Sequence, residues 1–193
     1  MHMLSAEAST ARKARIREAS SSVFNYWFGY VANLSLTIWL ASRAFVGRHS
    51  QLSAGTWLLC ALSGVLLWTL SEYVLHRYLY HEVDSVLKVG HDLHHEEPRS
   101  LLGVPWWMTS IVLVAVYYGL SAMGDPAMTG VVMAFAWLGY VGYCAMHHAF
   151  HHATWRARWF VTARRHHMIH HARHNVNWGV TTSLWDRVFG TRS

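Results

Sequence analysis

Apolar residues are gathered into four long runs that are separated by polar segments. The runs cover residues 23–46, 52–75, 101–123 and 126–146. The first contains one charged residue, Arg43, the second contains Glu72, and the last two contain none. Each run exceeds the roughly 18 residues that a helix needs to cross the hydrocarbon core of a bilayer. The pattern predicts an all-α integral membrane protein with four transmembrane helices.

Turn and cap residues agree with this plan and place the ends of two helices. Pro105 lies at the opening of the third run, and Asp125-Pro126 is typical of the N-cap and first residue of a helix. We expect one membrane domain over residues 1–193, consisting of a basic N-terminal segment (1–21), four spans (22–151) interrupted by a polar link (76–100), and a C-terminal cap (152–193).

Composition and charge support a membrane protein and suggest its orientation. Apolar residues make up 53% of the chain and charged residues 13%, about half of the roughly 25% found in soluble domains. Fourteen of the 16 Lys and Arg residues lie in the N-terminal segment, the link or the C-terminal region. By the positive-inside rule these parts, and both termini, are cytoplasmic, which favours the cytoplasmic membrane. The net charge of +6 therefore requires no nucleic-acid partner.

Histidine is the unusual component, with 16 residues in the chain, 14 of them between positions 76 and 174. They form four groups at the cytoplasmic ends of the predicted spans: His76 and His81; His91, His94 and His95; His147, His148, His151 and His152; and His166, His167, His170 and His171, with His174 following. His2 and His49 lie apart from these groups. The arrangement predicts a histidine-rich cap on a helical stem.

The spacing within the groups is that of ligands on helices. Residues at i, i+3 and i+4 share a helix face, so His91, His94 and His95 can converge, as can the corresponding residues of the last group. His76 and His81 are about 140° apart on an α-helix, so we expect them to bind different metals, or one metal across a helix end.

The number of imidazoles indicates two metal ions, because a single octahedral ion takes at most about six ligands. Imidazole suits iron, copper, zinc and nickel, so the count does not identify the metal. His147 and His148 compete for one role, His166 can be a mere neighbour of His167, and His174 can be solvated. A flexible metal-buffering tract is disfavoured, because Leu, Met, Ile and Phe interrupt the groups.

The ordered groups resemble the histidine boxes of the membrane fatty acid hydroxylase and sterol desaturase superfamily. The resemblance covers roughly residues 70–191 and includes His91-Asp-Leu-His-His95, His167-Met-Ile-His-His171, Asn177-Trp-Gly and Leu184-Trp-Asp-Arg-Val-Phe-Gly-Thr191. It implies a non-haem di-iron monooxygenase that uses O2 and external electrons to hydroxylate a lipid C–H bond. The metal ligands that it implies are His76, His81, His91, His94, His95, His147, His151, His152, His167, His170 and His171. No catalytic residue beyond the ligands is expected.

The substrate and the electron donor stay open. A fatty acyl chain fits best, but the third group also reads as His147-x4-His152, the form found in β-carotene hydroxylases, and a sterol desaturase would share the chemistry. We expect no fused haem domain, so that a separate ferredoxin or small cytochrome with its reductase supplies the electrons. A multi-pass metal transporter or sensor is the alternative of a different class, but transporters place ionisable groups near the midplane.

Two acidic residues have further interpretations. Glu72 lies one helical turn before His76 and is expected to accept a hydrogen bond from an imidazole that binds metal. Asp186 follows Ser183 at the spacing of a capping box, with Gly190 closing a short helix, so capping alone would explain it.

Overall fold

The structure, a computed structural model, describes residues 2–45 and 52–193, with side chains from residue 10 onward. The described residues contain no strand, which confirms the all-α class. The elements are α1 (His2–Ser20), α2 (Val23–Arg43), α3 (Ala54–Val74), the π-helix η1 (Leu75–Glu82), α4 (Val86–Glu96), α5 (Trp106–Ser121), α6 (Pro126–His152), α7 (Arg158–Ala172) and α8 (Leu184–Val188).

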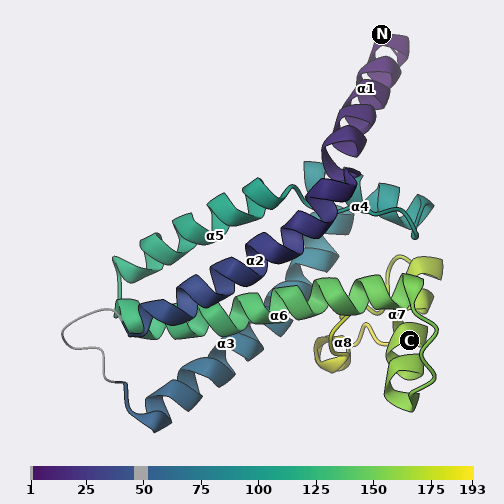
Figure 1. The fold of residues 1–193 in the computed structure, drawn as a ribbon. Helices are drawn as coiled ribbons and strands as arrows, with labels where there is room; N and C mark the ends of the chain where they lie inside the picture. The colour runs from purple at the N-terminus through teal and green to yellow at the C-terminus, as the bar shows by residue number, and fades with distance from the viewer. Residues whose placement is uncertain (1, 46–51) are drawn as a thin grey trace.

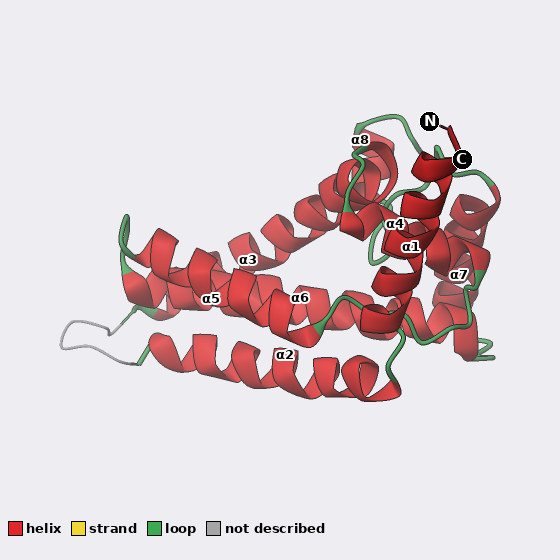
Figure 2. Ribbon diagram, turned by 90° about the horizontal axis from the view of Figure 1, so that it is seen from above, coloured by secondary structure: helices red, strands yellow, loops and turns green. Residues whose placement is uncertain are grey.

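The four long helices α2, α3, α5 and α6 run beside one another and form the stem (Figures 1 and 2). Helix α6 packs against α3, α2 and α5, and α5 also packs against α2. One core cluster joins three of these helices through Leu40, Leu113, Tyr117, Met133 and Ala134. Gly64 allows α3 and α6 to approach closely, because a Cβ there would collide with the carbonyl oxygen of Val132.

The outer surface of the stem is apolar. On α3, the exposed fractions of Leu58, Leu59 and Leu62 are 61%, 67% and 59%. Contact of this apolar surface with water is unfavourable, whereas contact with lipid is not. Two helices of the described part are long and apolar enough to cross a membrane, residues Ala54–Glu82 and Pro126–His152, whereas α5 has only 16 residues. The two long helices indicate membrane association. Helices α2 and α5 occupy the other two predicted runs.

The predicted helix starts are confirmed, but two helices extend beyond their apolar runs. Asp125 accepts hydrogen bonds from the backbone N–H groups of Ala127 and Met128, and Pro126 is the first residue of α6. Helix α6 continues to His152, past the end of its apolar run at residue 146, and α3 passes directly into η1. Both helices thereby carry their histidines out of the apolar stem.

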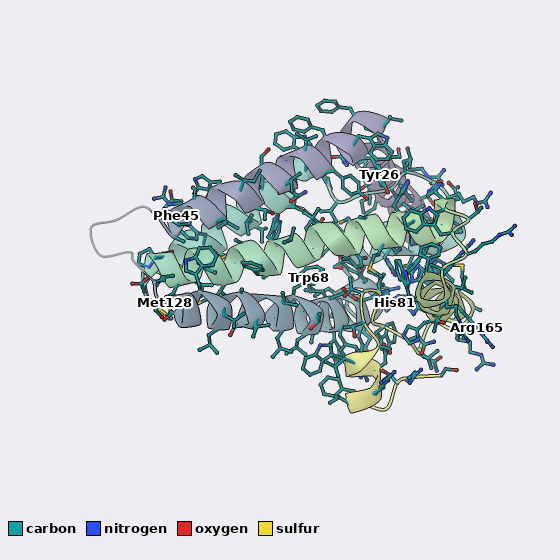
Figure 3. All side chains as sticks on the ribbon, turned by 60° about the horizontal axis from the view of Figure 1, so that its bottom comes forward. Tyr26, Phe45, Trp68, His81, Met128 and Arg165 are labelled. Carbon is teal, nitrogen blue, oxygen red and sulfur yellow. The ribbon has the colours of Figure 1, made fainter. Side chains whose placement is uncertain are left out.

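The polar elements gather at one end of the stem. Helices α1, α4, α7 and α8 lie around this end, which Figure 1 shows on the right. In Figure 3 Tyr26, His81 and Arg165 lie at this end, whereas Phe45 and Met128 lie at the opposite end. A small core of Ala149, Phe150, Phe160 and Val180 joins α6 to α7 and to the C-terminal loop. The cap is thus packed onto the continuation of α6.

Candidate metal centre

Ten histidines of the cap converge into two clusters of five. The first cluster contains His76, His81, His91, His95 and His170, and the second contains His94, His147, His151, His167 and His171. In each cluster the five ligand nitrogens lie within 4.8 Å of one another. Ten of the eleven ligands expected from the sequence are therefore brought together, in two sets that could each hold a metal ion.

The π-helix places His76 and His81 in the same cluster. In a helix with i→i+5 hydrogen bonds, residues five positions apart are about one turn apart, so the two side chains share a face. The backbone N–H of Val83 donates to the carbonyl of Tyr78 at 2.8 Å, which is the bonding of that geometry. Of the two expected arrangements, different metals or one metal across a helix end, the shared cluster disagrees with the first, which assumed an α-helix, and agrees with the second.

Adjacent histidines on α4 and α7 face different clusters. His91 and His95, at i and i+4, lie in the first cluster, while His94 lies in the second. On α7, His167 and His171, also at i and i+4, lie in the second cluster, while His170 lies in the first. The imidazoles of His95 and His171 stack with their centroids 4.2 Å apart, where the two clusters meet. Each helix therefore contributes ligands to both positions, which corrects the expectation of one shared face.

The distances between imidazole nitrogens fit metal coordination. Two nitrogens bound at right angles to an ion at about 2.0–2.1 Å would lie about 2.8–3.0 Å apart. The Nε2 atom of His91 lies 3.1 Å from that of His76 and 3.0 Å from that of His95. In the second cluster the Nε2 atom of His167 lies 2.9 Å from that of His151 and 3.1 Å from that of His171. A metal ion at each centre would satisfy these lone pairs together.

Backbone carbonyls orient two ligands of the first cluster. His76 donates from Nδ1 to the carbonyl of Trp178 at 2.5 Å, and His170 donates from Nδ1 to the carbonyl of Val176 at 2.9 Å. These bonds fix the tautomer that leaves Nε2 free to bind metal. In the second cluster, His147 Nε2 is buried without a hydrogen-bond partner among the described residues, and a bound ion would supply that partner.

The imidazoles outside the long helices are held neutral. Burial, with the neighbouring histidines, lowers the pKa of His94 to about 2, of His171 to about 3 and of His170 to about 4. The same causes lower the pKa of His91 and of His167 well below the ordinary value. Neutral imidazoles keep the lone pair that a metal ion needs.

The remaining histidines lie outside the clusters. His152, an expected ligand, is exposed and stacks on His148 with centroids 4.3 Å apart, because both project from a different face of α6 than His147 and His151. His166 bonds to Asp186, and His174 is exposed beside His95. The side chain of His2 and all of His49 lie outside the described part of the chain, so their expected absence from the site stays a prediction.

Glu72 supports the cap through the backbone rather than through an imidazole. Its carboxylate accepts hydrogen bonds from the N–H groups of Val180 (2.5 Å) and Thr181 (2.9 Å) and from the Thr181 hydroxyl (2.5 Å). No described histidine donates to it. The expected bond to a metal-binding imidazole was therefore wrong, but Glu72 anchors the loop whose carbonyls hold His76 and His170.

Asp186 is the second anchor of this loop. Its buried carboxylate accepts hydrogen bonds from Trp178 N–H, Gly179 N–H, the Thr191 hydroxyl and His166 Nε2, at 2.8–3.2 Å. Ser183 makes no side-chain cap, so the capping-box interpretation was wrong, although Gly190 ends α8 with a φ of +68° as expected. The Asn-Trp-Gly and Trp-Asp-Arg segments thus form one clamp beside the first cluster, a role that spacing alone could not reveal.

A cavity of about 350 Å³ opens beside the clusters. His91, His94 and His147 line it at the cap, and apolar and aromatic residues of the stem, including Met108, Tyr140 and Val141, line the rest. Tyr26 and Tyr30 also face it, and their hydroxyls bond to His148 Nδ1 and to the carbonyl of Cys144, both at 2.9 Å. The volume is that of a small-molecule site. An apolar ligand in this cavity would lie next to both metal positions.

Comparison with known proteins agrees with the site. The family model described as fatty acid hydroxylase matches residues 61–191. Dihydroceramide fatty acyl 2-hydroxylase FAH2 of Arabidopsis thaliana is 34% identical over 167 residues, covering 80% of this chain and 70% of that protein. Fatty acid 2-hydroxylase of Rattus norvegicus is 34% identical over 98 residues, covering 46% and 26%.

A solved structure matches the fold as well as the sequence. The structure described as full-length scs7p, in which only the hydroxylase domain is visible, superposes with a TM-score of 0.74 and 26% identity. The match covers 91% of this chain and 68% of that chain. The family model spans most of the chain and includes every residue of both clusters. The chain is therefore a member of the fatty acid hydroxylase family, a family of O2-dependent oxidoreductases.

Proposed function

We propose that this protein is a non-haem di-iron monooxygenase of the membrane that hydroxylates carbon 2 of a fatty acyl chain. The observation that carries the proposal is the pair of five-histidine clusters at the head of an apolar cavity. The position of oxidation is taken from the relatives, which are named as fatty acyl 2-hydroxylases. The reaction balances as RH + O2 + 2 electrons + 2 protons giving ROH + H2O.

The ligands that we propose are the ten clustered histidines, without His152. A pair of iron ions held there would supply the redox chemistry that inserts one atom of O2 into a C–H bond. The chain itself positions both reactants. The cavity lining binds the acyl chain by apolar contact, the buried clusters exclude bulk water, and the clamp formed by Glu72 and Asp186 keeps His76 and His170 oriented.

We further propose that α2, α3, α5 and α6 all cross the cytoplasmic membrane, with both termini and the cap on the cytoplasmic side. Fourteen of 16 basic residues then lie inside, as the positive-inside rule requires. The acyl chain of a bilayer lipid would enter the cavity from the stem, so that the reacting carbon reaches the clusters at the membrane surface.

Electrons come, in this proposal, from a separate ferredoxin or small cytochrome with its reductase. Arginines concentrate on and around α7, which carries three metal-binding histidines: Arg156, Arg158, Arg164, Arg165 and Arg173. Such a basic surface favours encounter with an acidic partner. Turnover should therefore need an added reductase chain and should slow as salt screens the surface charges.

The test is product analysis with the iron-loaded protein in neutral lipid. Mass spectrometry should find 2-hydroxyacyl product that carries one atom of 18O from 18O2, and product should be absent from His95→Ala and His171→Ala. His148→Ala is the matched control, because His148 lies in the same part of the cap but outside both clusters. Oxidation of a carotenoid or a sterol in place of the acyl chain, or a double bond in place of the hydroxyl group, would refute the assignment.

A further inference from the structure

Helix α1 is held across α4 by three ion pairs. Arg12 pairs with Asp84 at 3.0 Å, Lys13 with Glu96 at 2.7 Å, and Arg17 with Glu97. Ile16 lies between these pairs, next to Gly90 of α4. The pairs are exposed, so they orient α1 more than they stabilise the fold.

Arg15, the remaining arginine of α1, lies at the cavity beside the clusters. Arg15 makes no ion pair with any described residue, and it lines the cavity together with Ile16, Ala19 and Ser20. Helix α4, which packs against α1, also lines the cavity and presents His91 and His94. Arg15, which is exposed, therefore stands at the cap end of the cavity, on the helix that packs beside the one carrying His91 and His94.

The cavity lining contains a positive charge and no negative charge among the described residues. Among the described residues that line it, Arg15 is the one Lys or Arg, and no Asp or Glu is present. An arginine next to an apolar space, with no carboxylate to neutralise it, attracts an anion, and its guanidinium suits carboxylate and phosphate oxygens.

Oxidation at carbon 2 places the polar head of the substrate at this same end. Carbon 2 is bonded to the acyl carbonyl carbon, so the head must lie close to the clusters while the tail extends into the stem. We propose that Arg15 binds an anionic head, a carboxylate or a phosphate near the acyl carbonyl, and thereby selects negatively charged acyl lipids. This inference rests on the proposed function for the orientation of the substrate.

Lipid binding is measured on the whole 193-residue chain in neutral detergent, without oxygen or reductant. Radiolabelled palmitate is bound, and unlabelled palmitate, palmitoyl lysophosphatidate and a neutral palmitoyl ceramide compete for the site. We expect the two anionic lipids to compete better than the ceramide. Stronger competition by palmitate would identify a carboxylate as the preferred head, and stronger competition by palmitoyl lysophosphatidate would identify a phosphate. Arg15→Gln should weaken the binding of the anionic lipids about tenfold and leave the ceramide unchanged, whereas Arg15→Lys should retain part of the preference.

Arg12→Gln is the matched control, because it removes a cation of the same helix that is paired with Asp84. If Arg15→Gln does not fold, the unaltered protein still tests the inference, because it should prefer anionic lipids over the ceramide and this preference should decrease as salt is added. Equal competition by the ceramide, or equal effects of Arg12→Gln and Arg15→Gln, would overturn the inference. Selective binding without any hydroxylated product would refute the proposed function and leave the headgroup inference standing.

Discussion

Replacing Asp186 with asparagine should loosen the C-terminal clamp and weaken one of the two metal positions. Burial acts to raise the pKa of Asp186, but hydrogen bonds, first from His166 and then from Gly179, Thr191 and Trp178, hold it below its usual range. The side chain is therefore ionised at neutral pH, and all four of its bonds are charge-assisted. Asparagine has the same shape but keeps only one accepting oxygen.

The magnitude follows from the donors that face the carboxylate. Each carboxylate oxygen accepts one backbone N–H, from Trp178 or from Gly179, so the amide group of asparagine must point at one of them. A buried N–H that loses its acceptor costs about 1–3 kcal/mol, and the loss of charge assistance adds about 1 kcal/mol. We expect about 2–4 kcal/mol, which lowers the Tm by roughly 4–16 °C for a chain of this size.

The effect on metal should be confined to the first cluster. Trp178 and Val176 hold His76 and His170, which both belong to that cluster, through backbone carbonyls next to the clamp. Loss of such supporting bonds typically weakens metal binding about 10–100-fold. Chelator titration of the iron-loaded protein should therefore release one ion early and the second at the concentration seen without the substitution.

The control is Asp84→Asn, because Asp84 is exposed and forms only a surface ion pair with Arg12. This variant should lose less than about 1 kcal/mol of stability, so its Tm should change only slightly. Asp186→Asn with an unchanged Tm, or with both ions released together, would show that the clamp does not act on the first cluster.

Three further predictions concern ligands and topology. His95→Ala should retain one ion per chain instead of two, because it belongs to the first cluster alone; elemental analysis that finds two would contradict the division. His151→Ala should abolish hydroxylation while His152→Ala keeps most of it, because only His151 lies in a cluster; equal loss in single-turnover assays would return His152 to the ligand set. A cysteine placed at Ser85 should resist an impermeant thiol reagent added outside intact cells, and labelling there would reverse the proposed orientation.

The stem and the histidine groups were predictable because their signals are local. Long apolar runs and a proline after Asp125 are read directly from the chain. The clamp was not, because it depends on contacts between distant segments. Glu72 bonds to Thr181 and Asp186 to Trp178 only after α3, α7 and α8 have packed. A carboxylate near a histidine in sequence gives no indication of which backbone donors it will meet.

The division of ligands depends on helix geometry that spacing leaves open. Neighbouring residues on a helix point about 100° apart, so His94 and His95 separate naturally when a metal position lies on each side of α4. His76 and His81 required the opposite, since an α-helix would have separated them. The chain resolves this with a π-helix, in which the wider turn costs hydrogen-bond quality but aligns the two imidazoles. Because the segment continues α3 without a break, packing of the long apolar helix can offset that cost. The irregular backbone is therefore located where the metal centre needs it, and inserting or deleting one residue between His76 and His81 should remove iron from the first cluster while the second cluster keeps its ion.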